Sequence, residues 1–158
     1  MKPIRTLGCL ILAVVMTASL GFGQNKPHAL LSQQKVCAEE ARKAFNKSFK
    51  AEQDGVSYDF TSHYDAQNNV CYVLVHGSGA VHGSGTNANS SAYVSYSLFD
   101  AMEGRTYGEY VWINSTQKKY WEVPPMMCDV KPRGSDKMLC HSDDEFDQLI
   151  DKYFGIGS

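Results

Sequence analysis

The spacing of apolar residues changes twice along this chain, and these changes constrain its fold more than any other feature. Over residues 30–53 apolar side chains recur every three or four residues, which predicts an amphipathic helix that ends at Gly55. From residue 58 to residue 123 the period is two, which predicts β-strands. The helical period returns after Ser142, which forms a capping-box pattern with Glu145. This order predicts an α+β domain with an N-terminal helix, an antiparallel meander and a C-terminal helix.

The meander is expected to contain five strands, and both helices are expected to pack on one face of the sheet. Residues 77–91 contain only Gly, Ala, Ser, Thr, Asn, His and one Val, which predicts a mobile loop without core contacts. Residues 30–158 are therefore expected to form a single α+β domain that includes this loop. The predicted strands are YDFTSHY, VCYVLVH, AYVSYSLF, TYGEYVWI and KYWEV.

Residues 1–23 have the organisation of a signal peptide. Lys2 and Arg5 precede the apolar run LGCLILAVVM, which is short for a membrane span, and small residues follow it. Cleavage is expected near Gln24, with residues 24–29 as a flexible leader. Lipidation of Cys9 and an uncleaved anchor helix are the alternatives. Export places the protein in the periplasm or outside the cell, with no membrane span left after cleavage.

The charge balance disfavours two classes of partner. The full chain has 15 basic and 17 acidic residues, and removal of Lys2 and Arg5 leaves 13 against 17, a net charge of −4. A mildly acidic chain without a basic stripe is a poor match for nucleic acid or anionic lipid. The predicted state is a monomer that binds no nucleic acid.

Four cysteines remain after residue 23, an even number that indicates two disulfides in an exported domain. Three pairings are possible. Cys128 and Cys140 bracket a segment with turn residues, so their union is the simplest, and it leaves Cys37 to join Cys71. A zinc site is disfavoured because no CxxC spacing occurs.

The stretch VHGSG occurs at residues 75–79 and 81–85 and resembles the oxyanion loop of α/β-hydrolases. That fold also needs a G-x-S-x-G nucleophile turn, which this sequence lacks, and a parallel sheet. We therefore interpret the repeat as a glycine-rich loop rather than a hydrolase motif.

Two alternative chemistries involve polar side chains of this chain. His76 and His82, with His63 or Asn87, are candidate ligands for weak binding of a divalent metal. A small hydrolase would need two of the strand carboxylates or histidines; the candidate carboxylates are Asp100, Glu103, Glu109 and Glu122. No cofactor, metal or catalytic residue is predicted, and a non-catalytic role is favoured.

The acidic run near the C-terminus has two interpretations. Its position at a helix start agrees with capping and with the helix dipole, whereas a calcium loop would alternate its ligands and turn at glycine. We favour the first interpretation. The run contains Asp143, Asp144, Glu145 and Asp147.

An aromatic band is the strongest candidate for a binding face. Its rings either pack in the core and in cross-strand pairs, or form an exposed patch that binds a protein or a glycan. Its members are Tyr107, Tyr110, Trp112, Tyr120 and Trp121, joined by Tyr93 and Tyr96.

Several segments resemble a group of small exported bacterial proteins with a YGEYVW…KYWEVPP…C…C pattern: FTSHYD, VCYVLV, LFDAMEGRTYGEYVW, KYWEVPPMMC and CHSDDEFDQLIDKYF. This resemblance implies no activity. The helix-then-meander order is also similar to cystatin-like folds, which implies inhibition of a hydrolase as one form of binding. The expected function is a non-catalytic, exported binding module for a protein or a glycan.

Overall fold

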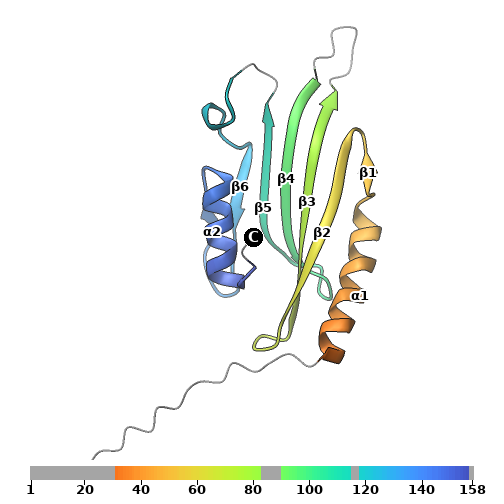
Figure 1. Cartoon of the computed structure of the whole chain (residues 1–158). Helices are drawn as coiled ribbons and strands as arrows, with labels where there is room; N and C mark the ends of the chain where they lie inside the picture. The colour runs from red at the N-terminus through yellow and green to blue at the C-terminus, as the bar shows by residue number, and fades with distance from the viewer. Residues whose placement is uncertain (1–30, 83–89, 115–117, 157–158) are drawn as a thin grey trace, which may run out of the picture.

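The structure is a computed structural model that describes residues 31–82, 90–114 and 118–156. These residues form an antiparallel sheet flanked by two α-helices (Figure 1). The helices are α1 (Leu31–Ser48), α2 (Asp143–Phe154) and the short 3₁₀ helix η1 (Tyr120–Glu122). The strands are β1 (Glu52–Gln53), β2 (Val56–Asp65), β3 (Val70–His82), β4 (Ser90–Asp100), β5 (Thr106–Asn114), β6 (Met127–Val130) and β7 (Met138–Leu139).

Each strand of the sheet pairs with the next strand along the chain, so the predicted antiparallel meander is present. The predicted number of five strands is wrong, because the described residues form seven. The segment KYWEV contains η1 instead of a strand. There the ring of Tyr120 packs on Trp112, with 4.6 Å between ring centroids, and Pro124 and Pro125 lack the N–H groups that a ladder needs. The pairing with β5 is made instead by β6.

Strand β3 continues through His82, so the prediction of a loop that begins at residue 77 is wrong for residues 77–82. Gly77 pairs with Tyr58 on β2 and with Ser95 on β4. Ladder hydrogen bonds on both sides hold this part of β3 although its side chains are small. The prediction is also wrong for residues 90–91, which begin β4, whereas residues 83–89 lie outside the described residues.

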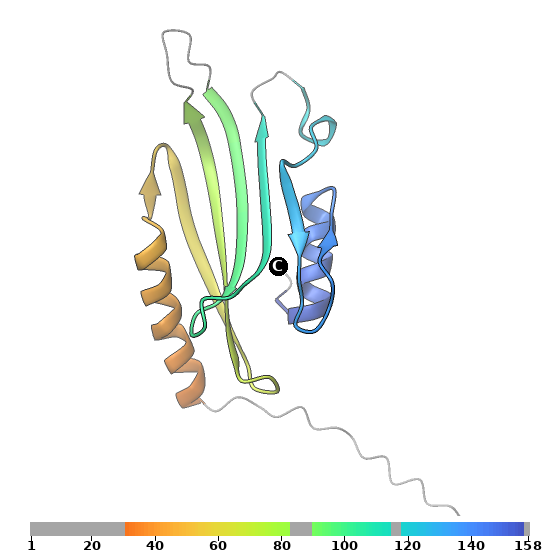
Figure 2. The ribbon, with the colours of Figure 1, turned by 180° about the vertical axis from the view of Figure 1, so that it is seen from behind.

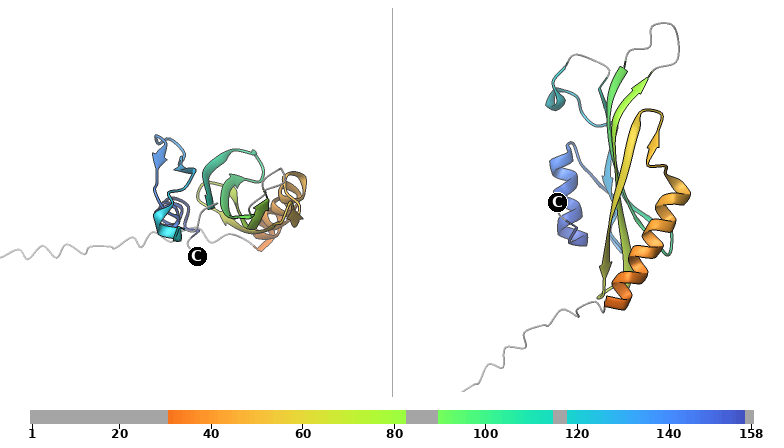
Figure 3. Two further views of the ribbon diagram at one scale, coloured as in Figure 1. Left: turned by 90° about the horizontal axis from the view of Figure 1, so that it is seen from above. Right: turned by 45° about the vertical axis from the view of Figure 1, so that its right-hand side comes forward.

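The two helices lie on opposite faces of the sheet, which corrects the prediction that they share one face (Figure 3). Successive residues of β3 alternate between these faces. Cys71, Val73 and Val75 pack against α1, and we name their side the α1 face. Val70 and Tyr72 belong to the cluster under α2, and we name their side the α2 face. Neither α-helix in the described part of the chain has the length and apolar character that a membrane crossing requires.

Two disulfides join the elements, with the predicted pairing. Cys37–Cys71 links α1 to β3, with the two Cα atoms 5.3 Å apart. Cys128–Cys140 links β6 to the segment before α2, with the Cα atoms 5.0 Å apart. One disulfide therefore joins α1 to the sheet, and the other joins the sheet to the segment that leads into α2.

The start of α2 agrees with its sequence signal. The hydroxyl of Ser142 accepts a hydrogen bond from the backbone N–H of Glu145 at 3.2 Å. The carboxylate of Glu145 accepts the backbone N–H of His141 at 2.7 Å, one residue before the position that a capping box uses. Both bonds satisfy backbone donors at the helix start, where the helix dipole also favours acidic side chains.

Candidate functional site

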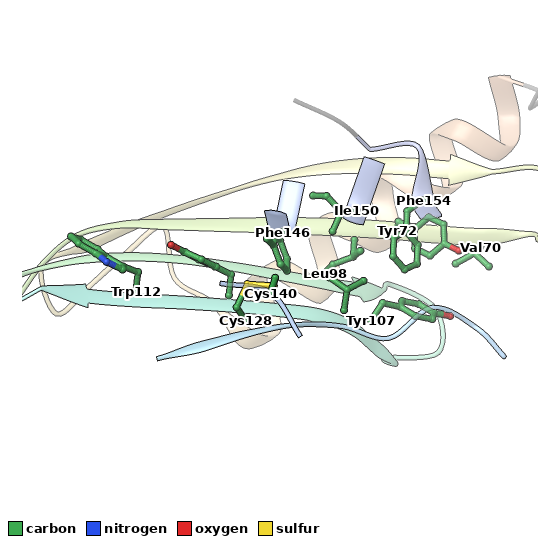
Figure 4. Close-up of a cluster of buried hydrophobic side chains, with 12 residues drawn as sticks. Val70, Tyr72, Leu98, Tyr107, Trp112, Cys128, Cys140, Phe146, Ile150 and Phe154 are labelled. Carbon is green, nitrogen blue, oxygen red and sulfur yellow. A yellow bond between two sulfur atoms is a disulfide. The ribbon is translucent and has the colours of Figure 1, made fainter. Parts of the chain in front are cut away.

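The structure divides the aromatic band between the core and the surface. Tyr107, Tyr110 and Trp112 are 1%, 1% and 5% exposed, and they belong to the core cluster of the α2 face (Figure 4). Tyr110 packs on Phe146, Tyr107 on Phe154 and Trp112 on Tyr120, so the prediction of these three rings as a binding face is wrong. The exposed members are Tyr120, at 37%, and Trp121, at 76%.

The segment that carries Trp121 is held against the core by hydrogen bonds on both sides of this residue. The Tyr110 and Tyr120 hydroxyl oxygens are 2.9 Å apart, and the indole N–H of Trp112 donates to the Val123 carbonyl at 2.9 Å. The Glu122 carboxylate accepts the backbone N–H of Lys119 at 3.1 Å. η1 is therefore a fixed platform, although it has only three residues.

Trp121 itself points away from these contacts. Its one ring partner among the described residues is Lys119, whose Nζ lies 5.2 Å from the ring centroid. A large, mostly exposed indole on a fixed backbone loses little conformational freedom when a partner binds it. This arrangement is suited to binding, whereas it contributes little to the core.

Burial changes the acidity of several core tyrosines. It raises the pKa of Tyr72 to about 12, and the nearby Tyr107 and Asp65 act in the same direction. Burial also raises the pKa of Tyr110, while its hydrogen bond with Tyr120 opposes that change. The pKa of Tyr120 is raised by burial and by its hydrogen bonds with Tyr110 and Asp143.

These shifts predict alkaline destabilisation. The pKa of Tyr72 is higher in the folded state than the ordinary value of 10.0, so its contribution to stability is complete below about pH 10. That contribution is lost as the pH rises from about 10 to about 12, because the unfolded state ionises first. We expect the melting temperature to fall over this interval and absorbance at 295 nm to resolve a late-titrating group. One transition near pH 10 for all nine tyrosines would contradict this.

The glycines of the HGSG stretch have packing roles. A Cβ atom on Gly77 would lie 2.6 Å from the ring of Tyr58 and 2.6 Å from Oγ of Ser95. A Cβ atom on Gly79 would overlap the backbone oxygen of Gly55. Glycine at these two positions lets neighbouring residues approach the backbone of β3, which explains the motif without an oxyanion role.

The predicted histidine ligands are only partly described. His76 lies on the α2 face, where its Nδ1 is 3.5 Å from Oδ2 of Asp59 and its ring stacks on Tyr96 at 5.1 Å. His63 pairs with Tyr72, four residues along β2 from Asp59, which separates it from His76 by about 13 Å. The side chain of His82 and residue Asn87 lie outside the described residues. Within the described ranges no group of three His, Cys, Asp or Glu side chains is arranged to hold a metal.

Three of the four candidate catalytic carboxylates contact a cation or a backbone N–H. Asp100 is buried and lies 3.7 Å from Arg133, which also contacts Glu103 at 3.2 Å. Glu109 pairs with Ser97, whose side chain lies on the α1 face, whereas Asp100 pairs with Tyr72 on the α2 face. Glu122 binds the backbone of η1, as described above. Asp100, Glu103 and Glu122 thus have structural partners.

The acidic run lies at the start of α2. The hydrogen bonds from His141 lower the pKa of Glu145, the bond from its backbone contributing most. Burial raises the pKa of Asp147, and the neighbouring Asp143 and Asp144 add to this effect. The contacts of Glu145 with the backbone agree with the capping interpretation of this run.

Comparison of the chain with family models, with curated proteins and with solved structures finds no match. The candidate site is therefore defined by its own geometry: Trp121 on the fixed η1 platform.

Proposed function

We propose that the protein is an exported, non-catalytic binding domain that engages a partner protein through Trp121. Two disulfides support export, because such bonds persist in oxidising compartments. The exposed indole on η1 is the observation that carries the binding role. Inhibition of a hydrolase is one activity of this class, and it would place Trp121 in the partner's cleft.

An exposed methionine near Trp121 in the sequence favours a protein over a glycan. Met126 follows two prolines after η1 and is 72% exposed. Tryptophan and methionine are enriched in protein–protein interfaces, where a few aromatic anchors supply most of the binding free energy. A partner with an apolar socket for the indole is therefore the expected ligand.

Site-specific photo-crosslinking tests this proposal. The photoreactive residue p-benzoyl-phenylalanine is placed at Trp121 in one variant and at Tyr153 in a matched variant. Tyr153 is also exposed and has its own lysine, Lys152, with Nζ 5.0 Å from the ring centroid. In the exported fraction of the native host, we expect a discrete protein adduct from position 121 and none from position 153.

Competition then measures the contribution of the indole. An excess of unlabelled Tyr153→Ala should suppress the adduct as well as the natural protein does, whereas Trp121→Ala should be about thirtyfold or more weaker, as for an interface anchor. Trp121→Ala should leave the melting temperature within a few degrees, because the ring is mostly exposed. Equal competition by both variants, or no adduct at position 121, would contradict the proposal. An adduct with a glycan would assign the partner to that class instead.

A further inference from the structure

A second candidate site lies on the α1 face, where α1 stands beside the β4–β5 hairpin (Figures 1 and 2). A cleft of about 560 Å³ separates them. This volume falls within the range of small-molecule sites in proteins, roughly 300–1,000 Å³. The residues that define its chemistry are Lys43, Lys47, Phe49, Ser97, Phe99 and Thr106.

The floor of the cleft is aromatic. Phe49 and Phe99 are half-buried and pack against the α1-face core, so each contributes both to the core and to the surface of the cleft. Phe49 also lies 5.7 Å from Phe45 in a stacked arrangement, which orients its ring. An apolar or aromatic group placed on these rings would bury surface without displacing a side chain.

Hydroxyl groups form the wall opposite α1. Ser97 on β4 and Thr106 on β5 both lie on the α1 face, since Ser97 pairs with Val75 and Thr106 pairs with Phe99. Both residues line the cleft. They offer donors and acceptors to the polar part of a ligand.

The charges around the cleft leave one cation without a partner among the described residues. Lys43 is 2.7 Å from Glu40, and this hydrogen bond raises the pKa of Lys43. The carboxylate of Glu103 is 3.2 Å from Arg133. The carboxylate of Asp100, another residue of the cleft lining, lies 3.7 Å from Arg133. With Arg133 included, three cations and three carboxylates lie around the cleft, so its net charge is zero, and the unpaired cation is the group that can meet an anion.

Lys47 is that cation, and it lies one helical turn after Lys43 on the same wall. A lysine in the last turn of a helix also complements the helix dipole, which accounts for its presence but not for the aromatic floor beside it. An exposed ammonium next to an apolar surface matches a ligand with one anionic group and one apolar body.

We propose that this cleft binds a small amphipathic organic anion, whose apolar body lies on Phe49 and Phe99 and whose charge faces Lys47. The site is separate from Trp121 and does not depend on the function proposed for it. A carboxylate, sulfonate or phosphate would serve as the anionic group, because lysine binds each of them as a point charge.

Two fluorescent probes that differ in charge test the proposal. One is 1-anilinonaphthalene-8-sulfonate, and the other is N-phenyl-1-naphthylamine, the same ring system without the sulfonate. We expect the sulfonate probe to bind in a saturable, one-to-one manner. Lys47→Gln should weaken its affinity about tenfold, which corresponds to about 1.4 kcal/mol. The control Lys50→Gln removes the same charge three residues away, outside the cleft lining, and should leave the affinity within twofold.

The neutral probe distinguishes loss of the Lys47 charge from damage to the cleft itself. Lys47→Gln should leave its affinity unchanged, and added salt should weaken only the sulfonate probe. Ser97→Phe should fill the cleft and abolish binding of both probes, and circular dichroism checks that this variant is folded. Trp121→Ala should have no effect on either probe, which excludes binding at η1.

Equal affinities of the sulfonate probe for Lys47→Gln and Lys50→Gln would overturn the proposal, as would unchanged binding in folded Ser97→Phe. If Ser97→Phe does not fold, the test rests on the affinities of the sulfonate probe for Lys47→Gln and Lys50→Gln. Loss of sulfonate binding in Trp121→Ala would likewise overturn it, because the probe would then report on the other site.

Discussion

Phe146→Ala is expected to lower the free energy of unfolding by about 3–5 kcal/mol, the range for removal of a large buried ring. The Phe146 side chain is 0% exposed and lies between α2 and the sheet. Its ring is 5.8 Å from that of Tyr96 and 5.9 Å from that of Tyr110. A Cβ atom on Gly108 would lie 3.3 Å from it, which shows how closely the ring meets the strand. Urea unfolding followed by circular dichroism measures the change.

The matched control for Phe146→Ala is Tyr153→Ala on the same helix. Tyr153 is 40% exposed, so its loss should cost about 1 kcal/mol or less. Similar losses for the two variants would show that α2 is not held by its buried stripe, and the account of the α2 face would be wrong.

Removal of the Cys37–Cys71 bond should have an effect of comparable size. The two cysteines are 34 residues apart, for which the chain-entropy model gives about 4 kcal/mol. The double variant Cys37→Ala/Cys71→Ala should therefore melt about 10–20 °C lower in a calorimetric scan under non-reducing conditions.

The second disulfide provides the comparison for this experiment. Cys128 and Cys140 are 12 residues apart, and their loop predicts about 3 kcal/mol. The Cys128→Ala/Cys140→Ala variant should retain the higher melting temperature of the two. The reverse order, or a change of less than about 3 °C in both variants, would contradict the role of the disulfides in stability.

Much of the fold could be predicted from local patterns. Both helices are present and α2 follows the start signal at Ser142, although α1 ends at Ser48 rather than at Gly55 because residues 52–53 form β1. The turn at Gly104 has the positive φ of 68° that favours glycine. The disulfide pairing follows from the short segment between Cys128 and Cys140. These features depend on residues close in sequence, so a single chain is enough to predict them.

The errors arise where long-range pairing decides the structure. The run VCYVLV in β3 is apolar at every position, which is typical of a strand buried on both faces, yet both helices were expected on one face. Residues 77–82 carry no strong strand signal and are held by their neighbours β2 and β4. The four-residue strand β6 lies in MCDV, where no periodicity can be measured.

The candidate site was only partly visible in the sequence. Alternation along β5 predicts that Tyr110 and Trp112 share a face, but not that Phe146 of α2 packs on Tyr110 while Tyr120 of η1 packs on Trp112. The exposure of Trp121 depends on the turn of η1 away from the sheet, which a two-residue period does not predict. Lys43 and Lys47 are a helical turn apart in the sequence, whereas the aromatic floor beside them forms only when the β4–β5 hairpin meets α1.

The position of Cys37 within α1 has a consequence for motions of the native state. This residue lies in the first half of the helix and is bonded to β3, so a helix that lifts from the sheet remains tethered to it. Its return is an intramolecular event at high effective concentration, and it does not require the opposite layer to open. Local opening on one side of the sheet can therefore occur without opening on the other side, and a separate disulfide limits each motion.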